Sequence, residues 1–279
     1  MNSFSVTRSW CQRWLRKIAI PLLAFCLGGF SMAGENISPI DRLIFPAPKA
    51  SYDAHLSNLV QLPLKGNKKV PALWLGNPQA KWTIIYFHGN AMDIGHCRPW
   101  AELLQKQGYA VLAVEYPGYG ISPGPPSEKN CYAAANAAYN YLRTTHGIPA
   151  EKIVLYGMSL GTGVATDLAS RKPVGALILE SPFLSTFRVI TGVKLVSGDR
   201  FDSATKIDKV KCPLLVIHGT ADRVVPYTHG TQLYDAAVNT SRKQFYKIDG
   251  GGHGNLLAKE KDNFLKTIAD FLSDSKSDK

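Results

Sequence analysis

The feature that most constrains the fold of this 279-residue chain is a series of short runs made almost entirely of apolar and β-branched residues. The run from Trp82 to Phe87, WTIIYF, shows no alternation of apolar and polar residues, which is typical of a strand buried on both faces of a sheet. Similar runs recur up to Asp249, separated by stretches with helical patterning. This alternation predicts an α/β fold, in which helices cover both faces of a mostly parallel sheet.

The runs predict about eight strands. They are expected at Asn58–Leu64, Val70–Gly76, Trp82–Phe87, Ala110–Tyr116, Lys152–Gly157, Ala176–Ser181, Pro213–Gly219 and Lys243–Asp249. A Lys-Gly-Asn-Lys turn joins the first two and indicates an antiparallel pair, whereas right-handed crossovers should make the rest parallel. Helices are expected at Ser127–Thr145, Ser159–Ser170, Gly230–Val238 and Asn255–Leu272. Ligands bind at the carboxyl ends of the strands in such sheets, so the loops that follow strands should hold the site.

The first 33 residues have the pattern of a secretory signal. An apolar run begins at Ile18, and four cations precede it without any acid: Arg8, Arg13, Arg16 and Lys17. The run is shorter than the roughly 20 residues of a membrane helix. Small residues at Ser31 and Ala33 suit cleavage before Gly34. A retained N-terminal anchor and lipidation of Cys26 are the alternatives. All three export the domain of residues 34–279, which is then periplasmic, extracellular or membrane-anchored.

Charge and cysteine content exclude some classes of partner. The formal net charge of +11 falls to +7 without the four N-terminal cations. A basic surface permits contact with a membrane surface, but the rest of the chain has no dense Lys/Arg run, so no nucleic acid is expected. Three cysteines remain, Cys97, Cys131 and Cys212, and no metal-ligand spacing appears. We therefore expect no metal or other cofactor. One disulfide or three buried thiols would both fit.

The segment Gly157-Met158-Ser159-Leu160-Gly161 matches the G-x-S-x-G pattern of a serine nucleophile. It directly follows a predicted strand and directly precedes a predicted helix, which is the setting that this motif requires. The turn is sharp, so small residues must flank the serine where the backbone approaches its neighbours. The helix that starts there also directs its positive N-terminal end toward developing negative charge. Ser159 is the predicted nucleophile; a capping serine in a glycine-rich turn is the alternative.

A serine hydroxyl needs an adjacent base, and histidine is suited to that role. Where a serine of this motif acts in an open α/β sheet, an acid and then a histidine follow it in the chain. Three histidines follow Ser159. His253 lies among glycines between the last strand and the last helix, where a tight loop can present its ring, and it is the predicted base. His218 ends a buried run and is expected to be structural, and His229, at a helix start, is expected at the surface.

The predicted acid is Asp222, which follows the strand Pro213–Gly219 in the loop HGTADRVVP. Its carboxylate would accept the Nδ1–H of His253 and stabilise the imidazolium that forms. An aspartate in an Asx-type turn is the alternative interpretation. Asp249 and Asp235 are weaker candidates, because neither follows a strand with enough chain before His253 to fold over it.

Acyl transfer also requires N–H donors for the oxyanion, and these donors supply much of the catalysis. One donor should be the backbone N–H of Leu160, the residue after the nucleophile. The second should come from the loop His88-Gly89-Asn90-Ala91 after the third strand, where Asn90 is assigned and Ala91 is the alternative. His88 is interpreted as an organiser of this loop. Residues 182–210, which show no strand pattern, are expected to form a small cap over the site, with a plain surface crossover as the alternative.

Together these segments resemble the α/β-hydrolase superfamily: HGNAMDIGH, EYPGYGISPGPPSE, LYGMSLGTGVA, ESPF, IHGTADRVVP and GGGHGN. The likeness spans roughly residues 58–270 and is strongest to single-domain, small-cap hydrolases similar to membrane-associated depalmitoylases and serine-aminopeptidase-like esterases. The exported N-terminus departs from the cytosolic members of that group. The resemblance implies a catalytic triad and leaves the substrate open, because the superfamily hosts many chemistries.

Three functions fit these residues. The leading hypothesis is a cofactor-free serine hydrolase that cleaves carboxylic esters or thioesters, including lipid-like ones, through an acyl-enzyme. The second is a peptidase or amidase with the same triad. The third is a non-catalytic binding protein with a hydrolase fold, which the presence of nucleophile, base, acid and oxyanion loops disfavours. Labelling by a fluorophosphonate, which needs an activated serine, separates the third hypothesis from the first two.

Overall fold

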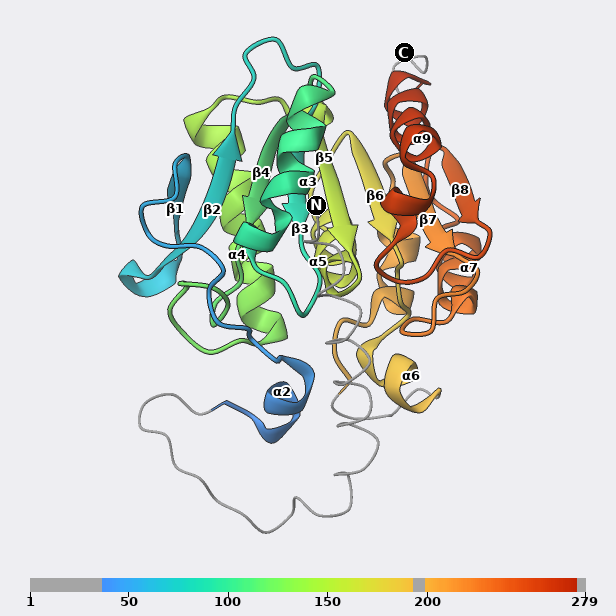
Figure 1. Ribbon diagram of the computed structural model, residues 1–279, viewed down its shortest axis with the longest axis horizontal. Coiled ribbons are helices and arrows are strands. Elements are labelled where there is room, and N and C mark those ends of the chain that lie inside the picture. Colours follow the sequence, from blue (N-terminus) through green and yellow to red (C-terminus); the bar gives the residue numbers. More distant parts are fainter. Residues whose placement is uncertain (1–36, 193–198, 275–279) are drawn as a thin grey trace.

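An eight-stranded sheet lies between two layers of helices in the computed structural model, which describes residues 37–192 and 199–274 (Figure 1). The strand order is β1-β2-β4-β3-β5-β6-β7-β8, and the pairs β1–β2 and β2–β4 are antiparallel while the others are parallel. The strands are β1 Leu59–Pro63, β2 Lys69–Leu75, β3 Thr83–Phe87, β4 Ala110–Val114, β5 Ile153–Met158, β6 Ala176–Glu180, β7 Leu214–Gly219 and β8 Lys243–Ile248. The predicted α/β fold and all eight strands are confirmed, with ends that shift by one or two residues.

The α-helices are α2 Pro39–Ile44, α3 Ile94–Lys106, α4 Glu128–Asn140, α5 Leu160–Ala169, α6 Thr186–Thr191, α7 Tyr227–Ala236, α8 Leu256–Lys259 and α9 Lys261–Asp274. Short 3-10 turns occur at Lys65–Asn67, Ala150–Lys152, Ser203–Thr205 and Ile207–Lys209, and a π-helical turn at Tyr141–Thr145 extends α4. The single helix expected at the end of the chain is two helices that meet at Glu260.

Helix α3 was not among the expected helices, because Gly95 and Pro99 interrupt its sequence pattern. Its first turn is stabilised by Asp93, whose carboxylate accepts the backbone N–H of His96 at 3.0 Å. Pro99 lies inside the helix, as its sixth residue, and removes one intrahelical donor. The local sequence pattern therefore did not predict this helix, which its N-terminal cap and its buried face stabilise.

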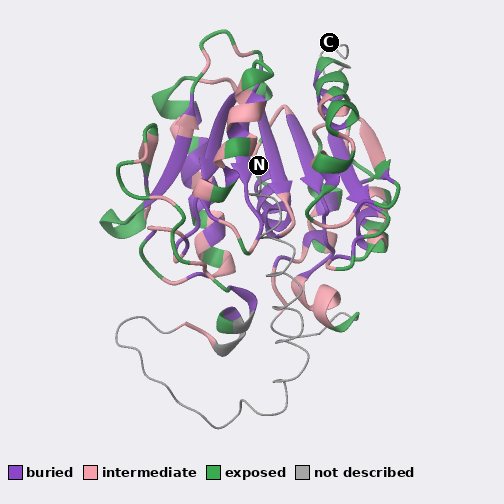
Figure 2. Cartoon of the chain, viewed as in Figure 1, coloured by how far each residue is buried: buried purple, intermediate pink, exposed green. Residues whose placement is uncertain are grey.

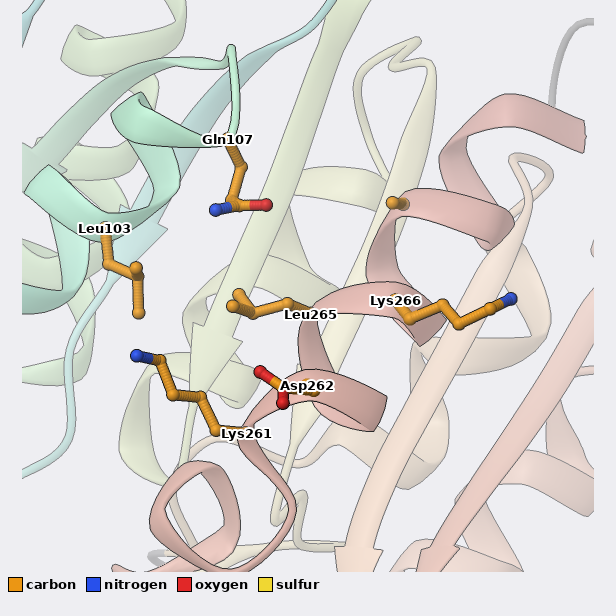
Figure 3. A pocket seen from close by; sticks show the side chains of 7 residues that line it. Leu103, Gln107, Lys261, Asp262, Leu265 and Lys266 are labelled. Carbon is orange, nitrogen blue, oxygen red and sulfur yellow. The ribbon is translucent and has the colours of Figure 1, made fainter.

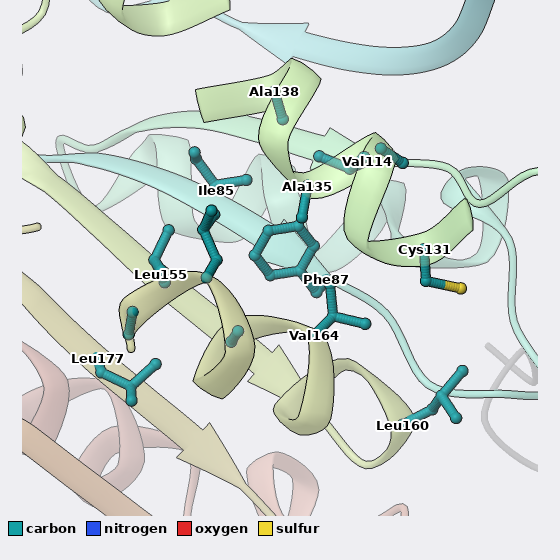
Figure 4. Packing of buried hydrophobic residues seen from close by; sticks show 14 of the residues in the cluster. Ile85, Phe87, Val114, Cys131, Ala135, Ala138, Leu155, Leu160, Val164 and Leu177 are labelled. Carbon is teal, nitrogen blue, oxygen red and sulfur yellow. The ribbon is translucent and has the colours of Figure 1, made fainter. Parts of the chain in front are cut away.

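The sheet separates two hydrophobic cores, and its central strands are buried on both faces (Figure 2). On one face, α4, α5 and α7 pack on the sheet; Figure 4 shows side chains such as Phe87 and Val164 interdigitating there. On the other face, α3, α8 and α9 cover the second core, which includes Phe264 and Phe271. Helices on both faces leave the carboxyl edge of the parallel strands open, and every loop expected to carry the site lies at that edge.

The segment expected to form a cap connects β6 to β7 and contains α6 at the carboxyl edge of the sheet (Figure 1). Phe183, Leu184 and Phe201 join the core beneath it, whereas α6 itself has no buried residue. Lys206 ties the segment to α5 by an ion pair with Asp167 at 2.9 Å. Residues 193–198 lie outside the described residues, so the cap over residues 182–210 stays a prediction.

Two further expectations concern the N-terminus and the cysteines. The proposed signal, residues 1–33, lies outside the described residues. Across residues 37–192 and 199–274, no helix combines the length and apolar composition that a bilayer span requires. The three cysteines of the described domain are free, and Cys97 and Cys131 are buried. No disulfide joins them, and the interpretation as buried thiols holds for Cys97 and Cys131 but not for Cys212, which is half-buried.

Candidate active site

The turn between β5 and α5 holds Ser159 in a strained conformation, with φ 51° and ψ −118°. A Cβ on Gly161 would lie 2.0 Å from the Phe87 carbonyl oxygen, and one on Gly157 would lie 2.3 Å from the Gly161 oxygen. The two glycines of the motif therefore allow β3, β5 and α5 to meet closely at this turn. The Ser159 backbone N–H donates to the Glu180 carbonyl at 2.9 Å, which ties the turn to the end of β6.

Ser159, His253 and Asp222 come together in one hydrogen-bonded relay. The Ser159 Oγ lies 2.8 Å from His253 Nε2, and His253 Nδ1 lies 2.8 Å from Asp222 Oδ2. The three residues follow β5, β8 and β7, whose carboxyl ends meet at one edge of the sheet. The Ala221 N–H donates to the Gly251 carbonyl at 2.9 Å and links the acid loop to the histidine loop. All three residues thus lie where sequence order predicted them.

The Asp222 side chain is fully buried and is surrounded by donors. Its Oδ1 accepts the backbone N–H groups of Val224 and Val225, each at 2.9 Å. Burial alone would raise the pKa of this carboxyl, but hydrogen bonds from His218 and His253, together with these N–H groups, outweigh burial and hold the pKa well below its usual range. Asp222 is therefore ionised at neutral pH and can hold the His253 Nδ1–H.

Two neighbouring histidines differ in how well they were predicted. His218 is buried, as expected; its Nε2 lies 3.1 Å from the Val225 carbonyl and 3.4 Å from Asp222 Oδ2, so it also supports the acid. The expectation that His229 lies at the surface is wrong. It is buried, and its Nδ1 accepts the Leu184 N–H at 3.3 Å, because α7 begins at Tyr227 and turns this residue toward the β6–β7 connection.

The loop after β3 lies beside the nucleophile. A Cβ on Gly89 would lie 3.6 Å from the Ser159 Cβ, so the next peptide unit is close to the serine. Leu160 is the first residue of α5, and the first N–H groups of a helix have no acceptor within that helix. Leu160 directly follows Ser159, and the Gly89–Asn90 segment lies beside it; the assignment of the Asn90 and Leu160 N–H groups as oxyanion donors stays a prediction.

The segment that contains α2 packs against both the oxyanion loop and the β6–β7 connection. The Phe45 ring lies edge-on to Phe201, with centroids 5.9 Å apart, and Asn90 Nδ2 donates to the Ile44 carbonyl at 2.6 Å. Arg200 also pairs with Asp41 at 3.2 Å. These contacts involve residues more than 40 positions apart, and no local sequence pattern indicates them. They place the start of the domain at the carboxyl edge of the sheet.

A surface hollow occurs between α3 and α9 (Figure 3). It is lined by Leu103, Gln107 and Leu265 together with charged side chains of α9, and none of the relay residues contributes to it. Within the described ranges, no group of three or more His, Cys, Asp or Glu side chains is arranged to hold a metal ion.

Two family models match consecutive parts of the chain. The model of the α/β-hydrolase fold matches residues 83–194, which include Ser159, and the model of the prolyl oligopeptidase family matches residues 194–277, which include Asp222 and His253. These matches agree with the order of the strands in the sheet and with the strand–Ser159–helix turn. The chain has the α/β-hydrolase fold.

Proteins similar to this chain include alpha/beta hydrolase domain-containing protein 17C of Mus musculus, which is 38% identical over 199 residues, covering 70% of this chain and 61% of the relative. The Caenorhabditis elegans protein aho-3 is 40% identical over 185 residues, covering 64% of this chain and 54% of the relative. The chain thus spans between one half and two thirds of the length of these curated relatives.

Solved structures share the fold at low sequence identity. The Pyrococcus furiosus esterase Pf2001 superposes with a TM-score of 0.67 and 20% identity, covering 88% of this chain and 98% of the esterase. A Paleococcus ferrophilus monoacylglycerol lipase gives a TM-score of 0.60 and 20% identity, covering 74% and 99% of the two chains. Both comparisons show an α/β-hydrolase fold that extends over most of this chain.

Proposed function

We propose that this α/β hydrolase is a serine hydrolase that cleaves carboxylic ester or thioester bonds through an acyl-enzyme. The observation that carries the proposal is the relay from Ser159 Oγ through His253 to Asp222, with both links at 2.8 Å. A nucleophile, a base and a group that orients the base are the parts that acyl transfer needs. The strained Ser159 turn supports it too, since strained backbone is concentrated at functional sites.

In the proposed reaction each residue has its own step. Ser159 Oγ attacks the substrate carbonyl while His253 Nε2 takes the hydroxyl proton, and the tetrahedral intermediate then expels the alcohol or thiol, which leaves with that proton. Water next attacks the acyl-enzyme, gives a proton to His253 and releases the carboxylic acid as Ser159 recovers its hydrogen. Asp222 holds Nδ1–H throughout and stabilises the imidazolium. The backbone N–H groups of Asn90 and Leu160 bind the oxyanion in both steps.

We propose ester and thioester substrates, small or lipid-like. The motifs around Ser159, Asp222 and His253 resemble those of depalmitoylase-like and esterase-like hydrolases. A peptidase or amidase with the same triad is the second candidate. The match of residues 194–277 to the prolyl oligopeptidase family favours it. Comparing p-nitrophenyl esters with aminoacyl anilides as substrates distinguishes the two, because only an amidase releases the aniline at a comparable rate.

The test of the proposal is labelling by a fluorophosphonate together with ester hydrolysis by Ser159→Ala. Removing a triad member costs about 10⁴–10⁶-fold in related enzymes, so the variant should retain less than a thousandth of the activity. Alanine keeps the volume of the turn small, so the thermal unfolding temperature should change little. Ser170→Ala, which removes a serine at the other end of α5, is the matched control. Full activity of Ser159→Ala, or no labelling of the unmodified chain, would contradict the proposal.

We also propose that the protein is exported, to the periplasm or the extracellular space, and that cleavage occurs before Gly34. The cations and the apolar run of residues 1–33 support this proposal. The mass of the protein recovered from the exported fraction tests it. A mass that includes residues 1–33 would show a retained anchor instead, and a lipid-sized increment on a chain beginning at Cys26 would show lipidation.

A further inference from the structure

His88 is a fully buried histidine of the oxyanion loop, and both of its ring nitrogens face oxygen atoms. Nδ1 lies 2.9 Å from the carbonyl oxygen of Gly89, and Nε2 lies 2.9 Å from Glu115 Oε1. Glu115, at the end of β4, is also fully buried. This pair has no link to the Ser159 relay. Burying a histidine and a carboxylate costs desolvation free energy, which only well-placed hydrogen bonds offset.

The hydrogen on Nδ1 follows from the chemistry of its partner. A carbonyl oxygen can only accept, so the His88–Gly89 contact requires a hydrogen on Nδ1. Glu115 meets Nε2 either as a carboxylate that accepts a second ring hydrogen or as a carboxyl that donates. Its Oε2 accepts the Tyr52 hydroxyl at 2.9 Å and the Ile94 N–H at 3.2 Å, so donors surround it. In the first arrangement the ring carries both hydrogens, and in the second it carries only the one on Nδ1; Nδ1 donates to the Gly89 carbonyl in both.

The Gly89 carbonyl belongs to the same peptide unit as the Asn90 N–H. The peptide is planar and trans, so the N–H points to the side opposite the carbonyl oxygen. The Met92 N–H also donates to the Gly89 oxygen, at 3.2 Å. Holding that oxygen toward His88 and Met92 therefore sets the direction of the Asn90 N–H, one of the two donors assigned to the oxyanion.

The Asn90 side chain is anchored independently of its backbone. Its Nδ2 donates to the Ile44 carbonyl at 2.6 Å, and its Oδ1 accepts the Tyr119 hydroxyl at 2.5 Å. The amide is thus engaged at both atoms, away from the nucleophile. What remains adjustable is the rotation of the peptide unit between Gly89 and Asn90, and His88 is the side chain that restricts it.

We infer that His88, supported by Glu115, is a positioning residue for the oxyanion hole: its Nδ1–H fixes the Gly89–Asn90 peptide unit with the Asn90 N–H directed to the reacting carbonyl. This inference rests on the proposed serine-hydrolase function and adds a residue that acts through the backbone and does not touch the substrate. Preorganised donors are effective because they need not reorient during the reaction. His88 supplies that preorganisation.

A matched pair of variants separates the two ring nitrogens. In His88→Asn the amide nitrogen is bonded to Cγ, as Nδ1 is, and can donate to the Gly89 carbonyl. In His88→Gln the amide lies one bond further out, near the position of Nε2, and can bond Glu115 instead. His88→Gln should therefore lower kcat for a p-nitrophenyl ester toward the roughly 10²–10³-fold loss of a missing oxyanion donor. His88→Asn should lose much less, and KM should change little in both.

A second readout excludes a merely structural effect. The affinity for a trifluoromethyl ketone, whose adduct with Ser159 carries an oxyanion, should fall in His88→Gln in proportion to kcat/KM. Rates are expressed per active site titrated with fluorophosphonate, so that partial unfolding does not count. His88→Asn leaves Glu115 without its partner, and His88→Asn/Glu115→Gln should recover its thermal stability. His55→Gln, an exposed histidine, is the control that should leave both readouts unchanged.

Equal losses in the two His88 variants once corrected for titrated sites would overturn the inference, and so would unchanged kcat in His88→Gln. A loss in KM alone would also overturn it, because oxyanion donors act on the transition state. If the unmodified protein shows no Ser159-dependent hydrolysis, the proposed function fails first. Turnover that depends on Ser159 but is indifferent to His88 rejects only the positioning role.

Discussion

Replacing Asp222 by asparagine tests the relay most directly, because the structure dictates how the new amide must lie. Asp222 Oδ1 accepts two backbone N–H groups, from Val224 and Val225. The amide oxygen of asparagine must take that position, since an NH₂ group cannot accept. Its NH₂ then faces His253 Nδ1, which has to present a lone pair. The ring hydrogen moves to Nε2, which faces Ser159, and His253 can no longer accept the serine proton.

The size of the effect follows from this tautomer. The same substitution in a serine protease triad keeps the geometry and lowers kcat by about 10⁴-fold, and a similar loss is expected here. The backbone hydrogen bonds of the acid loop are kept, so the chain should remain folded. The assay is kcat for a p-nitrophenyl ester at neutral pH, with thermal unfolding measured on the same sample. Asp249→Asn, an exposed aspartate ion-paired with Lys247, is the control and should leave kcat unchanged.

A double variant decides whether Asp222 acts through His253. Residues that act as one unit are strongly non-additive, so Asp222→Asn/His253→Ala should lose about as much activity as His253→Ala alone. If the two losses multiply, Asp222 does not orient His253, and Asp249 or Asp235 becomes the candidate acid. A loss of less than about tenfold in Asp222→Asn would refute the tautomer argument itself.

Two further predictions concern the frame of the site. Gly161→Ala should lower the free energy of unfolding by about 1–3 kcal/mol and reduce turnover, because its Cβ would lie 2.0 Å from the Phe87 carbonyl oxygen and force β3 and α5 apart. Urea unfolding measures this, and Gly254→Ala, whose Cβ would meet nothing within 4 Å, should retain stability. Asp93→Asn should lower stability at neutral pH. Burial raises the pKa of Asp93, but hydrogen bonds from His96 and Ser51 outweigh burial and lower it, so its contribution is present above about pH 4 and is lost as pH falls through the lower, folded-state pKa. Equal unfolding free energies of Asp93→Asn and the parent at pH 7 would contradict this.

The expected strands form, and Ser159, His253 and Asp222 come together, because the sequence signals for them are local. A run such as Trp82–Phe87 has to be buried on both faces wherever it lies in the sheet. The glycines of the Ser159 motif report a close backbone approach that any such turn requires, and the clearances at Gly157 and Gly161 show it. Chain order then selected His253 and Asp222, because loops after parallel strands emerge at the same edge.

Features that sequence reasoning missed depend on contacts between distant residues. Helix α3 contains a glycine and a proline, and its cap and buried face outweigh their local effect. His229 sits at a helix start, which indicated a surface position, but the β6–β7 connection covers it. Propensity is a weak prior that tertiary packing overrides.

The sequence by itself determined the α/β class, the strands, and the residues and order of the relay, because periodicity and glycine spacing are properties of neighbouring residues. Only the tertiary structure decided which groups support that relay. The Glu115–His88 pair spans 27 positions, and Asn90 contacts Ile44 across 46. No periodic pattern in the sequence indicates such hydrogen bonds. Each forms only after the sheet has brought its strand ends together and excluded water from between them.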